Sequence, residues 1–138
     1  MKDISTIHGA EDATGLRVGV VVSVYHESVT ESLRRGAIDA LVNAGAVSDE
    51  IVIIRVPGAF EVPLAARKAA ESGKFDALVC VGCIIRGETD HYDHISREAI
   101  RTIMDLTLSS NLALGFGVIT CENIEQAWAR ASTEKKNV

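Results

Sequence analysis

Short runs of aliphatic residues alternate along the chain with longer segments in which apolar residues recur every three or four positions. The aliphatic runs are rich in Val and Ile and are bounded by polar residues, which predicts strands. They cover residues 16–25, 51–56, 77–85 and 112–120. The first run is dominated by Val, which predicts a strand buried on both faces. The periodic segments predict amphipathic helices over residues 28–44, 59–72, 91–109 and 122–131.

The ends of the first two predicted helices carry local signals. Ser28 is followed three residues later by Glu31, which is the spacing of a capping box, so we expect Ser28 to begin the first helix. Gly45 and Gly73 come directly after the two helical patterns. Glycine readily adopts the left-handed conformation that ends many helices, so both residues predict helix stops.

Strands and helices alternate in the order βαβαβαβα, with short connections. This order predicts a four-stranded parallel sheet with right-handed crossovers and helices on both faces, which is a three-layer α-β-α sandwich of the α/β class. A chain of 138 residues can bury one core but is too short for two. We therefore expect a single domain over residues 1–138, with residues 1–14 as an extended N-terminal arm.

Composition restricts the partners and the compartment. The formal net charge of −5 and the scattered Lys and Arg residues argue against nucleic-acid binding, which needs a clustered positive face. No apolar run is long enough to span a membrane, and the N-terminus lacks the apolar stretch of a signal peptide. An odd number of cysteines argues against structural disulfides. We expect a cytoplasmic protein that binds no membrane.

The cysteines and histidines do not predict a metal site. Cys80 and Cys83 have the spacing of half a zinc site, but residues three apart on a strand point to opposite faces, and there is no second pair. His91 and His94 share a helix face, yet no third ligand is clearly aligned with them. We expect no bound metal. We expect His94 to be an ordinary polar residue in the first turn of a helix.

Unusual residues follow three of the predicted strands. They are the segments VYHE at residues 24–27, PGAFE at 57–61 and RGETDH at 86–91. Ligands of parallel α/β sheets bind at the carboxyl ends of the strands, so the three segments should meet at one edge of the sheet. His91 stands where a helix should begin, and its imidazole can give and take protons near neutral pH. A plain helix-capping histidine is the alternative.

Three blocks of the sequence resemble the lumazine synthase family. They are VPGAFEVP at residues 56–63, IRGETDHY at 85–92, and FGVIT at 116–120 running into ENIEQA at 122–127. The resemblance covers residues 15–133, and three blocks in matching order and spacing are more specific than one short motif. It implies a flavodoxin-like sheet. It also implies a transferase that condenses 5-amino-6-(D-ribitylamino)uracil with 3,4-dihydroxy-2-butanone 4-phosphate, without a cofactor, releasing phosphate and water.

The resemblance also implies roles for individual residues, each with an ordinary structural alternative. His91 matches the proton-transfer histidine and Tyr25 an aromatic residue that stacks on the pyrimidine, although an aromatic residue at a strand end is often only a lid on the core. The remaining matches contact one of three parts of the substrates. The ribityl chain is matched by Ala59, Phe60 and Glu61, and the pyrimidine by Cys83, Ile84 and Ile85. The phosphate is matched by Glu88, Thr89 and Arg130. We expect Glu88 to offer its N–H while its carboxylate points away. Without the resemblance, Arg130 would be a solvated helix-end arginine.

Phe116 matches a pocket residue of the family but lies about 13 Å from the carboxyl end of its predicted strand. We therefore expect Phe116, and Arg130 with it, to line the site of a neighbouring subunit. The helix predicted at residues 91–109 has two apolar stripes on nearly opposite faces, so it needs a second partner. The resemblance implies homopentamers, which in some relatives assemble into shells of sixty subunits, and riboflavin synthase as a candidate partner.

Two departures from the family pattern stand out. The chain stops at Val138, where relatives continue into one more helix, so we expect the usual C-terminal helix to be absent from this chain. His26 stands where relatives often have asparagine. Two other functions remain open: a catalytically silent cage or scaffold, and a flavin- or lumazine-binding module. A phosphate-binding module of the latter kind would need a glycine-rich loop after the first strand, which residues 23–28 lack.

Overall fold

The computed structural model describes residues 2–132 of the chain. Four strands alternate with four helices in the predicted order. The strands are β1 (Val18–Ser23), β2 (Ile51–Val56), β3 (Ala77–Ile85) and β4 (Ala113–Cys121). The helices are α1 (Glu27–Asn43), α2 (Val62–Glu71), α3 (His91–Ser109) and α4 (Ile124–Ala131), with 3₁₀ turns η1 (Ser48–Glu50) and η2 (Ala59–Glu61).

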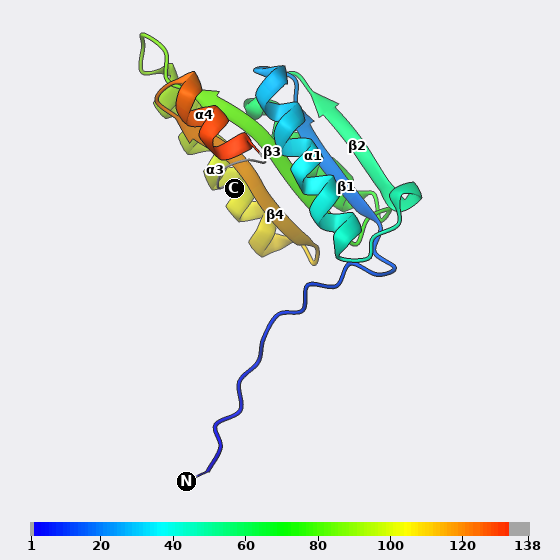
Figure 1. Cartoon of the computed structure of the whole chain (residues 1–138). Coiled ribbons are helices and arrows are strands. Elements are labelled where there is room, and N and C mark those ends of the chain that lie inside the picture. Colours follow the sequence, from blue (N-terminus) through cyan, green and yellow to red (C-terminus); the bar gives the residue numbers. More distant parts are fainter. Residues whose placement is uncertain (1, 133–138) are drawn as a thin grey trace.

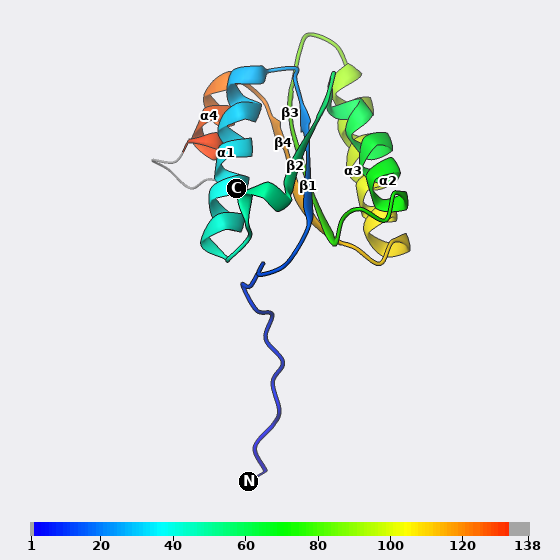
Figure 2. The same ribbon diagram turned by 90° about the vertical axis from the view of Figure 1, so that its right-hand side faces the viewer.

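The strands form one parallel sheet in the order β2-β1-β3-β4 (Figure 1). Helices α1 and α4 cover one face of this sheet, and α2 and α3 cover the other (Figure 2). This arrangement confirms the three-layer α/β sandwich, and the strand order is that of flavodoxin-like sheets. The order reverses between β1 and β3, so a crevice is expected outside the carboxyl ends of these two strands.

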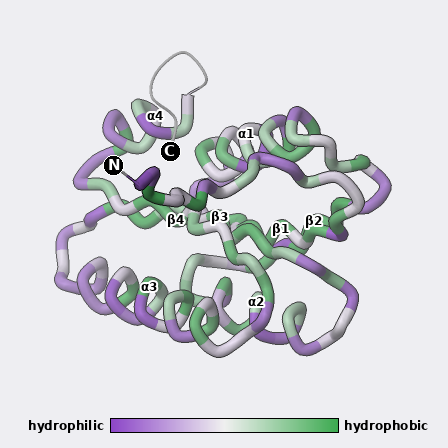
Figure 3. Tube along the Cα trace, turned by 90° about the horizontal axis from the view of Figure 1, so that it is seen from below, coloured by the Kyte–Doolittle hydropathy of each residue, from purple (hydrophilic) through white to green (hydrophobic). Residues whose placement is uncertain are grey.

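The sheet carries a separate apolar cluster on each face. The strands lie between the two helix layers in Figure 3. All residues of β1 are buried, as expected for a strand covered on both faces, whereas the edge strands β2 and β4 are partly exposed. Cys80 packs in the cluster beneath α2 and α3, whereas Cys83 packs in the cluster beneath α1. The two thiols therefore lie on opposite faces, as the sequence spacing predicts.

The start of α1 differs from the prediction. His26 is the N-cap residue, with left-handed dihedral angles of φ 58° and ψ 48°, and no side chain caps the helix. The proposed capping box at Ser28 is therefore wrong, because the helix begins one residue before Ser28 and Glu31 is engaged elsewhere. Its carboxylate pairs with Arg34 at 2.7 Å and with Arg55 on β2 at 2.7 Å.

Other element ends follow local capping. Gly45 and Gly73 have φ of 102° and 71°, which confirms them as stops after α1 and α2. The helix predicted from residue 59 begins as the 3₁₀ turn η2 and becomes α-helical at Val62. Helix α4 begins two residues later than predicted, because the Asn123 side chain accepts a hydrogen bond from the N–H of Gln126 and caps the helix.

An ion pair joins the segments that precede β1 and β3, at the amino ends of these strands. The Arg17 guanidinium lies before β1 and contacts both carboxylate oxygens of Asp76, which precedes β3, at 3.0 and 3.1 Å. The Asp76 carboxylate also accepts the backbone N–H of Arg17 at 2.9 Å. This pair holds the amino ends of two neighbouring strands together.

Residues 2–12 run away from the body of the molecule without helix or strand (Figure 1). The backbone joins the domain at Ala13, which is buried and whose N–H donates to the carbonyl of Ala44. The expected absence of a C-terminal helix concerns residues after 132, which lie outside the described residues. No helix within residues 2–132 is long and apolar enough to cross a membrane.

Candidate active site

A cavity of about 520 Å³ opens at the carboxyl ends of β1, β2 and β3. It lies where the strand order reverses, as expected for this topology. All three unusual segments of the sequence contribute to its wall. Eight of the residues singled out in the sequence line it: Tyr25, Ala59, Phe60, Cys83, Ile84, Ile85, Thr89 and His91.

The connection after β1 forms one wall of the cavity. Backbone hydrogen bonds from Val24 to Val56 and from Tyr25 to Pro57 extend the pairing of β1 with β2 beyond the strands. The Tyr25 side chain is 69% exposed and meets the His26 ring edge-on, with the ring centroids 4.5 Å apart. Burial lowers the pKa of His26 below its usual value, so its imidazole is more readily neutral.

The turn after β2 is closed by its own acidic residue. The Oε2 atom of Glu61 accepts a hydrogen bond from the backbone N–H of Gly58 at 2.9 Å. Glu61 itself is exposed and lies outside the lining of the cavity, whereas Ala59 and Phe60 line it. The carboxylate thus fixes the turn that presents these two residues, and its second oxygen remains available as an acceptor.

The end of β3 supplies the buried floor. Cys83 and Ile84 are almost fully buried, and Ile85 is half-buried. Burial, together with the neighbouring Cys121, raises the pKa of the Cys83 thiol to about 12. This thiol is therefore protonated at neutral pH, which excludes it as a ready nucleophile.

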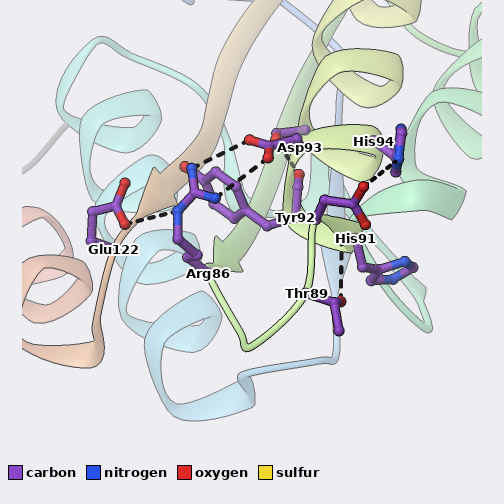
Figure 4. Close-up of polar contacts among 9 residues, drawn as sticks. Arg86, Thr89, His91, Tyr92, Asp93, His94 and Glu122 are labelled. Atoms are coloured by element: carbon purple, nitrogen blue, oxygen red, sulfur yellow. Dashed lines mark hydrogen bonds and ion pairs between the residues drawn. The ribbon is translucent and has the colours of Figure 1, made fainter.

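The segment between β3 and α3 carries the polar chemistry. The hydroxyl oxygen of Thr89 accepts the backbone N–H of His91 at 3.4 Å (Figure 4). Within residues 2–132, no acceptor contacts the N–H groups of residues 87–90, so they are free to hold an anion. The exposed His91 side chain borders the same cavity. His94 turns instead to Asp90, at 3.5 Å.

Arg86 is a cavity residue that the sequence did not single out. Its Nε atom lies 2.8 Å from a carboxylate oxygen of Glu122, and its two terminal nitrogens lie 3.3 and 3.4 Å from the oxygens of Asp93 (Figure 4). The guanidinium carbon lies 4.4 Å from the centroid of the Tyr92 ring. Asp93 holds the pKa of Arg86 above its usual value, with Glu122 contributing.

Besides Glu61, three predicted site residues lie outside this cavity. Glu88 is exposed on the loop and does not line it. Phe116 pairs with Cys80 in the β3–β4 register and is 50% exposed, five residues before the end of β4. Arg130 is exposed in the last turn of α4. The cavity of this subunit therefore brings together the His91 and Tyr25 segments without Phe116 or Arg130.

The side chains also limit the chemistry. No group of three or more His, Cys, Asp or Glu residues within residues 2–132 is arranged to hold a metal ion. The polar side chains among the residues that line the cavity are those of Tyr25, His26, Arg86, Thr89, His91 and Tyr92. They are suited to proton transfer and to binding of a small anionic molecule.

Fold and cavity together define an α/β protein of the flavodoxin-like class, with a small-molecule site at the switch point of its sheet. Comparison with known proteins specifies it further. The model of the 6,7-dimethyl-8-ribityllumazine synthase family matches residues 15–138. A protein of that name from Chlorobaculum parvum is 46% identical over 134 residues, which cover 97% of this chain and 86% of the relative.

The chain therefore belongs to the 6,7-dimethyl-8-ribityllumazine synthase family. It is an enzyme of riboflavin biosynthesis and a transferase, as the sequence resemblance implies. Its reaction condenses 5-amino-6-(D-ribitylamino)uracil with 3,4-dihydroxy-2-butanone 4-phosphate to 6,7-dimethyl-8-ribityllumazine, releasing phosphate and water.

Proposed function

We propose that this condensation takes place in the cavity at the carboxyl ends of β1–β3, with His91 as the proton-transfer residue. One observation carries the proposal: His91 lines the same cavity as Gly87 and Thr89, whose backbone N–H groups have no acceptor within residues 2–132, and as the apolar side chains of the β3 end. A phosphorylated substrate and a flat heterocycle would therefore lie on either side of an imidazole, a group that can both donate and accept a proton.

The phosphate end of the site is the loop before α3. Residues 87–90 directly precede the N-terminus of α3, where the helix dipole favours an anion, and their backbone N–H groups have no acceptor within residues 2–132. The Thr89 hydroxyl oxygen accepts from the His91 backbone, which leaves the hydroxyl hydrogen to donate to a phosphate oxygen. Glu88 contributes its N–H, with its carboxylate in solvent, because a carboxylate beside a phosphate dianion is unfavourable.

The pyrimidine end lies between β1 and β3. The exposed Tyr25 ring stacks on the heterocycle, while main-chain groups of Cys83, Ile84 and Ile85 hydrogen-bond its edge. The ribityl chain extends along Ala59 and Phe60 towards the free carboxylate oxygen of Glu61. This placement brings the amine of the pyrimidine towards the carbonyl of the phosphorylated partner.

The reaction is largely a series of proton movements. The amine and the ketone form an imine, phosphate is eliminated, and ring closure with loss of water completes the lumazine. His91 lies beside the phosphate loop, where it takes the proton that must leave carbon during elimination and returns protons during dehydration. Such a residue contributes about a hundredfold or more, and holding two substrates together supplies much of the rest.

A second subunit completes the site in this proposal. Phe116 and Arg130 lie outside their own subunit's cavity, so they act in that of a neighbour, where the Arg130 guanidinium contacts phosphate. The outer stripe of α3 supports association with other subunits, because Ile100, Met104 and Leu108 are 39%, 56% and 79% exposed in the isolated chain. The homopentamer that the family resemblance implies would cover this stripe. Further assembly into a shell would depend on residues after Thr133, outside the described part.

The cysteines support a cytoplasmic enzyme. Cys80, Cys83 and Cys121 are all free thiols and all buried, as expected in a reducing compartment. The two other functions considered from the sequence, a silent scaffold and a flavin-binding module, have no support in the comparisons.

Incubation with both substrates tests the proposal. Lumazine fluorescence should rise only when the pyrimidine, the butanone phosphate and the protein are all present. Reactions that lack one substrate, and reactions with the His91→Ala variant, are the controls. Equal rates with wild-type and His91→Ala protein would refute the role of His91 and remove the main support for placing the reaction in this cavity.

A further inference from the structure

Arg86 joins three segments around the candidate phosphate loop. Its backbone N–H continues the β3–β4 ladder by donating to the carbonyl of Cys121 at 2.9 Å. Its side chain then reaches Glu122, in the turn between β4 and α4, and Asp93, in the first turn of α3 (Figure 4). The loop of residues 87–90 therefore runs between the backbone of Arg86 and a helix turn held by the Arg86 side chain.

The positive charge of Arg86 is more than neutralised by its partners. Glu122 and Asp93 supply two carboxylates to one guanidinium, so the three side chains together carry a net negative charge. All three guanidinium nitrogens have a carboxylate partner, and one face of the group lies over the Tyr92 ring. A planar guanidinium suits such a two-sided bridge better than a lysine ammonium does. Little of its donor capacity remains for a substrate phosphate.

The bridge acts on the residues that are proposed to bind phosphate. Asp93 lies two residues after His91, and Tyr92 lies between them. A helix start that shifts or rotates would carry His91 and the Thr89 hydroxyl with it, because Thr89 is bonded to the His91 backbone. Misplacement of about 1 Å in such a group can reduce a rate severely.

We propose that Arg86 is a positioning residue that holds the loop of residues 87–90 in its phosphate-binding conformation through Asp93 and Glu122. It is not itself a ligand of the phosphate. The inference rests on the proposed function, in which this loop binds the phosphate of the butanone substrate. It extends the site to Glu122, which lies outside the cavity lining and does not contact the substrate.

The two roles for Arg86 predict opposite effects of removing its partners. If Arg86 is a phosphate ligand, Asp93→Asn or Glu122→Gln frees the guanidinium and lowers the KM for butanone phosphate. If Arg86 positions the loop, each substitution loosens the bridge and raises that KM. Both carboxylates are exposed by about half, so neither substitution should prevent folding.

The experiment measures kcat and the KM for each substrate in Arg86→Gln, Arg86→Lys, Asp93→Asn and Glu122→Gln. We expect Arg86→Gln to raise the KM for butanone phosphate roughly tenfold, and the two carboxylate variants to raise it about two- to threefold. The KM for the pyrimidine should remain within about twofold of wild type. Arg86→Lys should recover only part of the loss, since a lysine cannot span both carboxylates.

Arg67→Gln is the matched control, because it breaks an exposed arginine–carboxylate pair with Glu71 on α2, and it should leave all constants unchanged. A lower KM for butanone phosphate in Asp93→Asn or Glu122→Gln would overturn the inference, as would equal losses for both substrates in Arg86→Gln. Thr89→Val separates the two claims. If it leaves the KM for butanone phosphate unchanged, the assignment of residues 87–90 as the phosphate-binding loop is wrong. If it raises that KM while Arg86→Gln does not, only the role of Arg86 fails.

Discussion

The hydroxyl oxygen of Thr89 accepts a hydrogen bond from the backbone N–H of His91, 3.4 Å away. This bond joins a side chain suited to binding phosphate to the backbone of the residue suited to moving protons. The two groups therefore keep a fixed relative position at the start of α3.

His91→Ala should lower turnover by roughly ten- to several-hundredfold under saturating substrates, because proton transfer would then depend on water. The exposed side chain makes no contact on which packing depends, so fold and assembly should persist. Lumazine formation gives the rate, and circular dichroism and sedimentation serve as controls. Added imidazole should restore part of the rate. Wild-type turnover in the variant would contradict the proton-transfer role.

The sequence predicts the fold well where the periodicity of apolar residues alone sets the bounds of an element. The bounds of β2, β3 and α3 match the expectation residue for residue. Errors occur where one side chain or one unusual backbone conformation sets an end. The left-handed His26 displaces the expected cap at Ser28, and Asn123 delays the start of α4. In both places more than one residue could begin the helix, and only the three-dimensional contacts show which one does.

The candidate site is predicted less completely than the fold. The three strand-end segments meet at one cavity because parallel topology requires it. Arg86 was missed because its partners are distant or ambiguous in the sequence: Glu122 is 36 residues away, and Asp93 resembles an ordinary helix-start acid. The exclusion of Phe116 from its own cavity follows directly from counting residues along β4.

The backbone of His26 leads to a prediction about stability. Its φ of 58° is tolerated by Asn and His far better than by β-branched residues. His26→Asn should therefore keep the melting temperature, whereas His26→Val should cost about 1–2 kcal/mol. Thermal unfolding at fixed protein concentration measures both variants. A valine variant as stable as the asparagine variant would contradict the strain argument.

The ion pair between Arg17 and Asp76 predicts a pH dependence. Hydrogen bonds from Arg17 lower the pKa of Asp76 from 3.8 to about 2. Since the folded state has the lower pKa, the stabilising effect of the carboxylate is complete above pH 3.8 and is lost as the pH falls through about 2. Asp76→Asn should melt lower than wild type at pH 7, and the difference should shrink between pH 4 and pH 2. A difference independent of pH would contradict this account.

A site shared by two chains predicts complementation. Impaired His91→Ala subunits, mixed with impaired Arg130→Ala subunits after dissociation and reassembly, should recover activity above that of either variant alone. In an equal mixture about one quarter of the interfaces would pair an intact His91 with an intact Arg130. Each variant reassembled alone is the control. If subunits demonstrably mix but activity stays at the level of the single variants, both residues act within one chain.

The outer stripe of α3 predicts the consequence of a buried charge. Met104 is 56% exposed in the isolated chain, and packing of five copies of α3 around one axis would bury it. Met104→Lys would then place like charges around that axis without partners, which should break the ring or sharply lower its stability. Ala40→Lys, which adds the same charge to an exposed position on α1, should leave the ring intact. Sedimentation at micromolar concentration distinguishes the two variants. A compact, stable wild-type monomer would contradict the pentamer and, with it, the shared site.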